Sequence, residues 1–240
     1  MQNNLAILSD RSIHATYFVT ADVSANYPGF MEELKKTGGE IGVHLHPEQV
    51  LKGAGSYKHL KLYSAETQRK LIRDSLQALS EYRPVSFRAG RLSADKTTLR
   101  ILEELGFSCD SSVYPQSVFP DSADAFHPRL DGERLDILEI PVTCQNSTLM
   151  RISRHLGPRL DDRMRDAFIF SPILIKKAGK TGLKVLKLRY DRTRKEHDIA
   201  VFLMHSWDFL DKTFSDNLAS LLDHIVRRGD GFSRMRDIKG

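Results

Sequence analysis

Cysteines and long apolar runs are scarce in this sequence, and each shortage excludes a class of protein. The two cysteines, Cys109 and Cys144, lie far apart and form no CxxC pair, so a disulfide-bonded scaffold is not expected and a reducing compartment is compatible. The longest apolar stretch, 167–175, is interrupted by Ser171 and Pro172 and falls short of the roughly 20 residues needed to span a bilayer. No signal peptide is recognisable. We therefore expect a globular protein of the cytoplasm.

The remaining composition is that of a folded, basic protein. A length of 240 residues suits one large domain, and a hydrophobic content of 40% can supply its core. The formal net charge is +5, and basic residues clearly outnumber acids between 151 and 195. A local excess of this kind favours an acidic partner such as an anionic glycan, a nucleotide-linked sugar, a membrane surface or a nucleic acid.

Short apolar segments alternate along the chain with segments of helical period. Strands are expected at 15–19, 40–43, 85–87, 107–109, 138–142, 199–204 and 231–236, and helices at 30–37, 64–82, 94–105 and 216–228. The expected N-caps are Ser64, Ser93 and Ser215, and the expected helix stops are Gly38, Gly106 and Gly229. This alternation indicates βα units. The predicted fold class is therefore α/β: a distorted or incomplete (β/α) barrel of about six or seven parallel strands.

One region departs from this alternation. Residues 147–190 contain expected helices at 148–155, 160–167 and 173–189, the last of which is basic and amphipathic. We interpret 147–190 as a helical insertion within a single domain, 1–240. Its basic surface is either a binding face for an anionic carrier or membrane, or a solvated helix surface.

Residues with metal-binding or catalytic chemistry collect where the predicted strands end. His44 and His46 follow one strand two positions apart, so their imidazoles point to one side, as two ligands of a divalent metal would. Arg88, Asp110 and His205 follow three other predicted strands. Active sites of parallel α/β folds lie at this edge of the sheet. Each residue also has a structural explanation. His44 and His46 could be a surface pair and Arg88 could pair with a carboxylate. Asp110 could cap a helix, and His205 could be a core histidine.

Several segments, taken in order, resemble the polysaccharide deacetylases with a NodB-homology domain, of carbohydrate esterase family 4 type. The similar segments are HATYFVT, GGEIGVHLHP, FRAGR, FSCDSSV, FLMHSWDF and GDGFSRMRDI. They cover nearly the whole chain apart from the insertion, and their order and spacing agree with the family as well as their residues. The resemblance implies the barrel fold and a metal-dependent hydrolase that removes an acetyl group from an N-acetylated sugar of a polysaccharide or glycan precursor.

The resemblance also implies roles for individual residues. These are His44 and His46 as metal ligands, His205, Arg88 and Asp110 as catalytic residues, and Trp207 and Arg91 as substrate contacts. The expected metal is zinc, which polarises a carbonyl and lowers the pKa of a bound water to about 7. His205 would protonate the departing amine, and Arg88 would orient the catalytic base or Asp110. Trp207 would form an apolar wall against the sugar or simply pack in the core.

The sequence departs from the family pattern at two points. The second metal motif usually has histidines four positions apart, whereas Glu48 stands four positions after His44 and His46 stands two after it, as in an HxHP variant. Glu48 is therefore a third ligand candidate. The family's first motif, an Asp-Asp pair that supplies the base and the third ligand, is not found before 15–19; Asp22 could approach the site or serve as a helix cap. We therefore expect little or no deacetylase activity from these 240 residues.

Two other functions stay open. A non-catalytic barrel that binds a glycan or a partner could retain the fold without the base, and metal-free protein that still binds sugars would favour it. Nucleic-acid binding through 151–195 ranks last, because that segment lacks interleaved aromatic residues and a recognisable motif.

Overall fold

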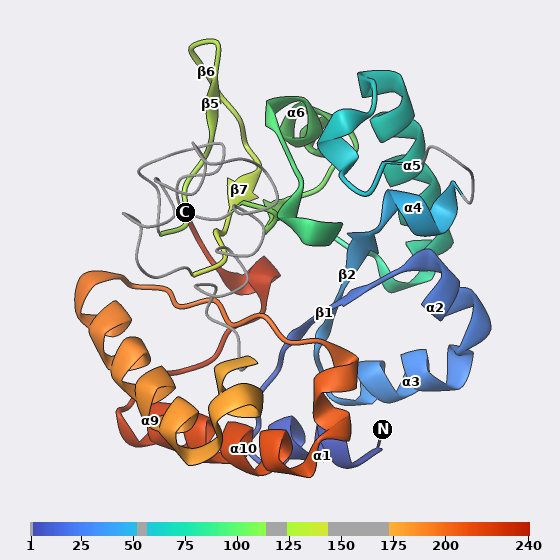
Figure 1. The fold of residues 1–240 in the computed structure, drawn as a ribbon. Coiled ribbons are helices and arrows are strands. Elements are labelled where there is room, and N and C mark those ends of the chain that lie inside the picture. Colours follow the sequence, from blue (N-terminus) through green and yellow to red (C-terminus); the bar gives the residue numbers. More distant parts are fainter. Residues whose placement is uncertain (1, 52–56, 114–123, 144–172) are drawn as a thin grey trace. The chain divides into compact units, whose positions relative to one another are not determined.

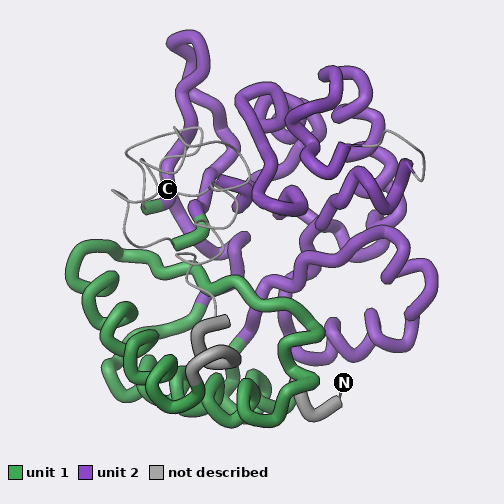
Figure 2. The backbone as a smooth tube through the Cα atoms, viewed as in Figure 1, with its two compact units in different colours: residues 1–13, 114–124, 142–232 green, residues 14–113, 125–141, 233–240 purple. Residues whose placement is uncertain are grey.

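The computed structural model describes residues 2–51, 57–113, 124–143 and 173–240, and the chain divides into two compact units (Figure 2). The sheet unit comprises residues 14–113, 125–141 and 233–240, and the helical unit comprises residues 1–13, 114–124 and 142–232. The single domain expected for 1–240 and the insertion expected at 147–190 stay predictions. The helices expected at 148–155 and 160–167 lie outside the described residues.

A five-stranded sheet forms the centre of the sheet unit (Figure 1). Its order is β1 (Thr16–Val19), β2 (Glu40–Leu45), β3 (Ser86–Ala89), β4 (Cys109–Asp110) and β7 (Leu138–Glu139). Every neighbouring pair is parallel, which confirms the predicted α/β class. In the described part of the chain β1 and β7 are the two edges, so the sheet does not close and the barrel is a distorted, open one.

Helices follow the first three strands, as βα units require. They are α2 (Ala21–Asn26) and α3 (Pro28–Lys36) after β1, α4 (Pro47–Val50) and α5 (Ala65–Ala78) after β2, and α6 (Lys96–Glu104) after β3. The unit also contains the 3-10 turns η1 (Leu60–Leu62), η2 (Ser80–Tyr82), η3 (Gly90–Leu92) and η5 (Met235–Asp237), and a hairpin of β5 (Arg129–Leu130) and β6 (Glu133–Arg134). Strands and helices share an apolar core that includes Val43, Phe87, Leu34, Ile72, Leu99 and Leu102. Burial of this core stabilises the unit.

In its described residues the helical unit contains two long helices. They are α9 (Ile173–Glu196) and α10 (Lys212–Arg227), accompanied by α1 (Gln2–Ser9) and the 3-10 turn η4 (Ser206–Leu210). The buried apolar side chains of α9 and α10 include Leu186, Tyr190, Leu218, Leu221 and Ile225. Two polar contacts support this packing: the hydroxyl of Tyr190 donates to Asp230 (2.7 Å), and His224 is 2.8 Å from Asp191. Among the described residues, none of the helices combines the length and the apolar character needed to cross a bilayer.

Local sequence signals predict several helix ends, with two corrections. Ser64 caps α5 and accepts a hydrogen bond from the N–H three residues on. The predicted stops Gly38, Gly106 and Gly229 all have positive φ. However, α6 begins after Asp95 and not after Ser93, because Asp95 completes a capping box. Similarly, α10 begins after Asp211, four residues before the predicted cap Ser215, because the Asp211 carboxylate accepts a backbone hydrogen bond in the first turn.

The strands expected at 199–204 and 231–236 are not formed. The backbone N–H groups of Val201 and Met235 instead donate to side chains within their own unit. The N–H of Val201 donates to the hydroxyl of Thr143 (2.7 Å), and the N–H of Met235 donates to the hydroxyl of Thr16 (2.8 Å). Because a strand needs a ladder of backbone partners, these contacts replace sheet pairing, and five parallel strands form in the described residues.

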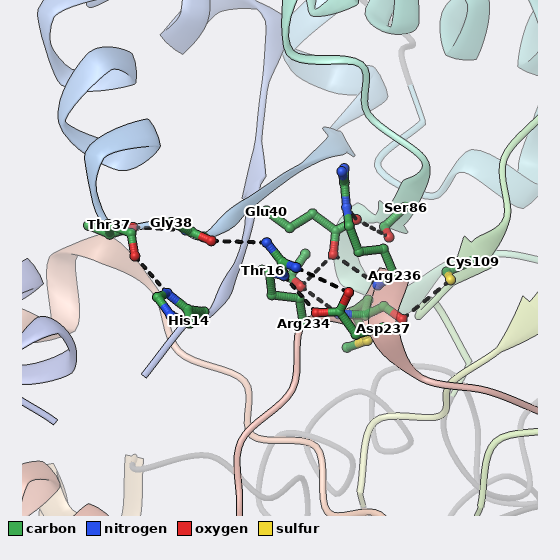
Figure 3. A network of polar contacts seen from close by, with 12 residues as sticks. His14, Thr16, Thr37, Gly38, Glu40, Ser86, Cys109, Arg234, Arg236 and Asp237 are labelled. Carbon is green, nitrogen blue, oxygen red and sulfur yellow. Dashed lines mark hydrogen bonds and ion pairs between the residues drawn. The ribbon is translucent and has the colours of Figure 1, made fainter. Parts of the chain in front are cut away.

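A buried polar network joins the C-terminal segment to the amino-terminal ends of the strands (Figure 3). Glu40 is at its centre. The Glu40 carboxylate accepts hydrogen bonds from the hydroxyls of Thr16 (2.9 Å) and Ser86 (2.6 Å) and from the backbone N–H of Arg236 (3.1 Å). The Arg236 guanidinium lies 3.2 Å from the same carboxylate. Glu40 therefore links the segment 233–240 to the first residues of β1, β2 and β3.

Candidate functional site

His44 and His46 lie together at the carboxyl end of β2. Their ring centroids are 4.8 Å apart and the rings are nearly perpendicular, with an interplanar angle of 85°. His44 Nδ1 is 2.7 Å from the carbonyl oxygen of Arg88, which fixes the ring. A metal ion would therefore be bound through Nε2 of His44, the nitrogen that faces away from this carbonyl. Both rings are partly exposed, so a ligand can reach them.

The FRAGR segment packs against His46 and Glu48. A Cβ atom on Gly90 would lie only 2.6 Å from Nδ1 of His46, so the glycine leaves room for this ring. The next residue, Arg91, has a left-handed backbone (φ 59°), a conformation that costs about 1–3 kcal/mol in non-glycine residues and is found often at functional sites. Its guanidinium donates to Oε1 of Glu48 (3.2 Å). The predicted substrate contact Arg91 thus lies beside the histidine pair.

Glu48 is an ionised partner of this pair. Oε1 of Glu48 lies 3.4 Å from Nδ1 of His46. Partial burial raises the pKa of Glu48, but hydrogen bonds from its own backbone and from Arg91, together with His46, outweigh this effect and hold the pKa below its ordinary value. Asp22, the other candidate carboxylate, is exposed in the first turn of α2, where an acidic residue favours the helix N-terminus.

Arg88 is the buried cation of the site. It lies beside His44 in the β2–β3 register, so both side chains leave the same face of the sheet. The guanidinium stacks 4.4 Å from the ring centroid of Phe18 and donates to the carbonyl (3.0 Å) and hydroxyl (2.8 Å) of Ser111. Burial lowers the pKa of Arg88 to about 10, so the side chain stays charged at neutral pH. Arg88 is held by Ser111, one residue beyond Asp110.

Asp110 faces a second acid instead. Asp110 pairs in register with Phe87, so its side chain leaves the sheet on the face opposite that of Arg88. On the other side it pairs with Glu139, and both acids are completely buried. The hydroxyl of Ser112 donates to Asp110 (2.6 Å). The predicted site residue Asp110 therefore belongs to a buried acid pair.

His205 belongs to the helical unit, where it precedes η4. Its ring stacks on Trp207, with centroids 4.3 Å apart and an interplanar angle of 12°. Asp208 is buried below the ring: its carboxylate accepts the backbone N–H of His205 (2.9 Å) and lies 3.6 Å from Nδ1. Trp207 is 59% exposed, so the packing role in a core does not apply to it. The approach of His205 to His44, which lies in the other unit, stays a prediction.

His44 and His46 offer two imidazoles of the donor type that a catalytic zinc ion uses. Zinc sites of enzymes use three protein ligands, typically imidazole or carboxylate. Within the described ranges no three His, Cys, Asp or Glu side chains gather closely enough to hold one ion. Oε2 of Glu48 is nevertheless buried without a hydrogen-bond partner in this part of the chain. His44 and His46 fit a divalent metal in donor type, with Glu48 as the nearest carboxylate.

Sequence reasoning missed two acidic residues of these sites. Glu139 interrupts the apolar segment Leu138–Val142, and a charged residue inside a buried strand is itself a signal of a special role. Asp208 stands three positions after His205, a spacing at which a carboxylate can orient an imidazole. The family resemblance assigned a catalytic role to neither residue.

Comparison with known proteins supports the motif-based resemblance. Residues 1–109 match the sequence model of the family described as polysaccharide deacetylase, a range that includes His44, His46, Arg88 and Arg91. The resemblance to the polysaccharide deacetylases is therefore confirmed. Searching curated proteins by sequence finds no significant match.

Solved structures share the fold at low sequence identity. Puue allantoinase has a TM-score of 0.65 at 15% identity, with 97% of this chain and 68% of that chain covered. A family 4 carbohydrate esterase from Streptomyces lividans in complex with acetate has a TM-score of 0.56 at 12% identity, with 97% and 84% covered. A mutant of a CE4 family pseudoenzyme has a TM-score of 0.56 at 13% identity, with 97% and 59% covered. At these identities the likeness establishes the fold alone.

Proposed function

We propose that this protein is a metal-dependent hydrolase that removes an acetyl group from an N-acetylated sugar of a polysaccharide or glycan precursor. The family match over residues 1–109 and the parallel α/β fold support this proposal. One observation carries it: His44 and His46 lie together at the carboxyl end of a parallel strand, and a backbone carbonyl orients the His44 ring. This edge is where parallel α/β folds bind their substrates.

In this proposal His44 and His46 hold the metal, and Arg91 contacts the sugar. The expected metal is Zn²⁺, which when bound would polarise the acetyl carbonyl and make a water molecule more acidic. Arg88 keeps a positive charge behind the histidines, where it favours the negative charge that develops on the carbonyl oxygen. Its fixed contacts with Ser111 and Phe18 mean that little reorganisation is needed during the reaction.

The proposal assigns the role of general acid to His205. Asp208 holds the backbone and lies near Nδ1, which leaves Nε2 as the nitrogen that would give a proton to the departing amine. The exposed indole of Trp207 offers a flat apolar surface for one face of a sugar ring. Asp110 acts indirectly, through the strand ends that carry Arg88.

An anionic carrier or membrane surface is the proposed partner of α9. Lys180, Lys184, Arg192 and Lys195 are exposed at intervals that bring them to one side of this helix, with exposed Leu188 among them. A basic face with an apolar residue suits a lipid-linked anionic substrate. A solvated helix surface is the competing explanation, since Arg192 already pairs with Glu196. Binding to anionic vesicles that weakens with salt would support the partner.

Metal binding and acetate release test the proposal together. With two imidazoles gathered, we expect the 240-residue chain to bind Zn²⁺ weakly and to release acetate from N-acetylated oligosaccharides slowly. His44→Ala should abolish both, and His205→Ala should keep zinc binding but lower turnover by about 10²–10⁴-fold. His14→Ala is the matched control, because His14 is an exposed histidine bonded to Thr37. Zinc binding that survives His44→Ala would contradict the proposal.

The second candidate is a non-catalytic barrel that binds a glycan or a partner. Two observations favour it: no third metal ligand gathers in the described residues, and the fold is also that of a CE4 family pseudoenzyme. This candidate predicts sugar binding that is unchanged by a chelator and by His205→Ala, without release of acetate. The hydrolase instead releases acetate, and both the chelator and His205→Ala should reduce that release.

A further inference from the structure

Asp110 and Glu139 form an acid pair inside the sheet unit. They are directly opposite each other in the β4–β7 register, so their side chains leave the sheet on the same face. Both residues are 0% exposed. Two carboxylates on directly paired residues that are shielded from bulk solvent cannot both be ionised at low cost, because like charges repel strongly in a buried environment. One proton on the pair removes this repulsion.

The hydrogen bonds indicate which acid carries the proton. Both oxygens of Asp110 accept hydrogen bonds from Ser112, one from the hydroxyl (2.6 Å) and one from the backbone N–H (3.2 Å). Glu139 accepts one, from the N–H of Val113 (3.2 Å), and its Oε2 is buried without a donor among the described residues. A proton on Glu139 turns this unsatisfied acceptor into a donor to Asp110.

The charges nearby agree with this assignment. Burial raises the pKa of Glu139 well above its ordinary value, and the negative charge of Asp110 raises it further. Burial also raises the pKa of Asp110, but hydrogen bonds from Glu139 and Ser112 oppose the rise. The buried Arg88 is the cation that acts on both acids. One proton on the pair leaves this buried group of one cation and two acids without net charge.

We propose that Glu139 is a neutral positioning residue that keeps its proton, donates a hydrogen bond to Asp110 and thereby holds the ends of β3 and β4 together. Asp110 in turn fixes Ser112, whose hydroxyl accepts the N–H of Ala89 (2.8 Å) in β3. The same turn carries Ser111, which holds the guanidinium of Arg88. The contacts thus run from Glu139 to Asp110, from Asp110 to Ser112, and from Ser112 to β3. Ser111, in the same turn, makes a second contact with β3 through Arg88.

The chain ends at the candidate metal ligand. The carbonyl of Arg88 contacts Nδ1 of His44, so the position of β3 sets the direction of Nε2. A displaced Ser111–Ser112 turn would release Arg88 and, with it, the His44 ring. The relevance of this step to catalysis rests on the proposed function. The shared proton and the orientation of His44 do not, because both can be measured without turnover.

Infrared and NMR spectroscopy of the 240-residue chain test the proposal. At neutral pH the native protein should show the C=O stretch of a protonated carboxylic acid, and Glu139→Gln and Asp110→Asn should each lose it. Glu133→Gln is the matched control, since Glu133 is an exposed glutamate of the same unit, and this variant should keep the band. A native protein without the band, or a band that persists in Glu139→Gln, overturns the assignment of the proton.

The positioning role has its own readout. Glu139→Gln can still donate a hydrogen bond to Asp110, so the ring resonances of His44, identified by their loss in His44→Ala, should stay in place. Glu139→Leu keeps the volume but removes the donor, and those resonances should shift. Unchanged His44 resonances in a folded Glu139→Leu protein overturn the role; if that variant does not fold, a shift in Glu139→Gln overturns it. A native chain that neither binds Zn²⁺ nor releases acetate contradicts the proposed function and leaves both spectroscopic results valid.

Discussion

Replacement of Glu40 by alanine should destabilise the sheet unit strongly. The Glu40 side chain is 0% exposed and is the acceptor for the hydroxyls of Thr16 and Ser86 and for the backbone N–H of Arg236 (Figure 3). Alanine leaves these three donors without an acceptor, at about 1–3 kcal/mol for each one that stays buried. It also removes the carboxylate beside the Arg236 guanidinium, which then keeps its contact with the carbonyl of Arg83 (3.4 Å).

The expected net loss is smaller than the sum of these costs. Removal of a buried carboxylate recovers its desolvation penalty, and Arg236 is exposed enough to regain water. Breaking a buried ion pair by removing one partner costs about 3–5 kcal/mol, and the access of water to Arg236 indicates the lower end, about 3 kcal/mol. For a protein of this size, this loss lowers Tm by about 6–12 °C.

Thermal and urea unfolding, followed by circular dichroism, measure this loss. Glu32→Ala is the matched control, because the Glu32 side chain is 56% exposed and its ion pair with Lys35 should contribute less than about 1 kcal/mol. Arg236→Ala should give an intermediate value, because Glu40 keeps its three hydrogen bonds. If Glu40→Ala costs no more than Glu32→Ala, the network does not stabilise the protein and the reasoning fails.

Two further predictions concern the other buried ionisable groups. Burial raises the pKa of Cys109 to about 11, so in a Cys144→Ser background Cys109 should resist thiol reagents at pH 7.5 until the protein unfolds; fast labelling of the native state would contradict this. A carboxyl whose pKa is higher in the folded than in the unfolded protein contributes stability at pH values below its unfolded-state pKa. This contribution is lost as the pH rises through the folded-state pKa, and it amounts to about 1.4 kcal/mol for each unit between the two pKa values. Stability of the native protein should therefore fall as pH rises above the ordinary range of a carboxyl, and Glu139→Gln should fall less steeply, while Glu133→Gln keeps the native slope. Parallel pH profiles for Glu139→Gln and the native protein would show that Glu139 is not the group responsible.

Much of the sheet was predictable because its signals are local. Apolar segments of three to five residues, each followed by a helical pattern, predict β1, β2 and β3 and their parallel order, and the structure confirms them. The histidine pair was predictable for the same reason: a strand alternates its side chains, so His44 and His46 had to point the same way. Their spacing needs no knowledge of the rest of the fold.

The expected strands at 199–204 and 231–236 show where local patterns fail. Both segments are apolar enough to form strands, but a strand exists only if neighbouring backbone groups are available to it. Thr143 and Thr16 supply side-chain oxygens to these segments instead, and neither residue is near them in the sequence. No pattern within the segments could reveal these distant acceptors.

The sequence by itself determined the strands β1, β2 and β3, the helices that follow them, and that two imidazoles at the end of β2 point to one side, because those features depend on neighbours within a few positions. Tertiary structure decided the partners: Ser111 for Arg88, Glu139 for Asp110, and Arg236 for Glu40. Each of these pairs depends on strand register or on the path of the C-terminal segment. Register joins residues that are distant in sequence, so one position of slip would exchange every partner.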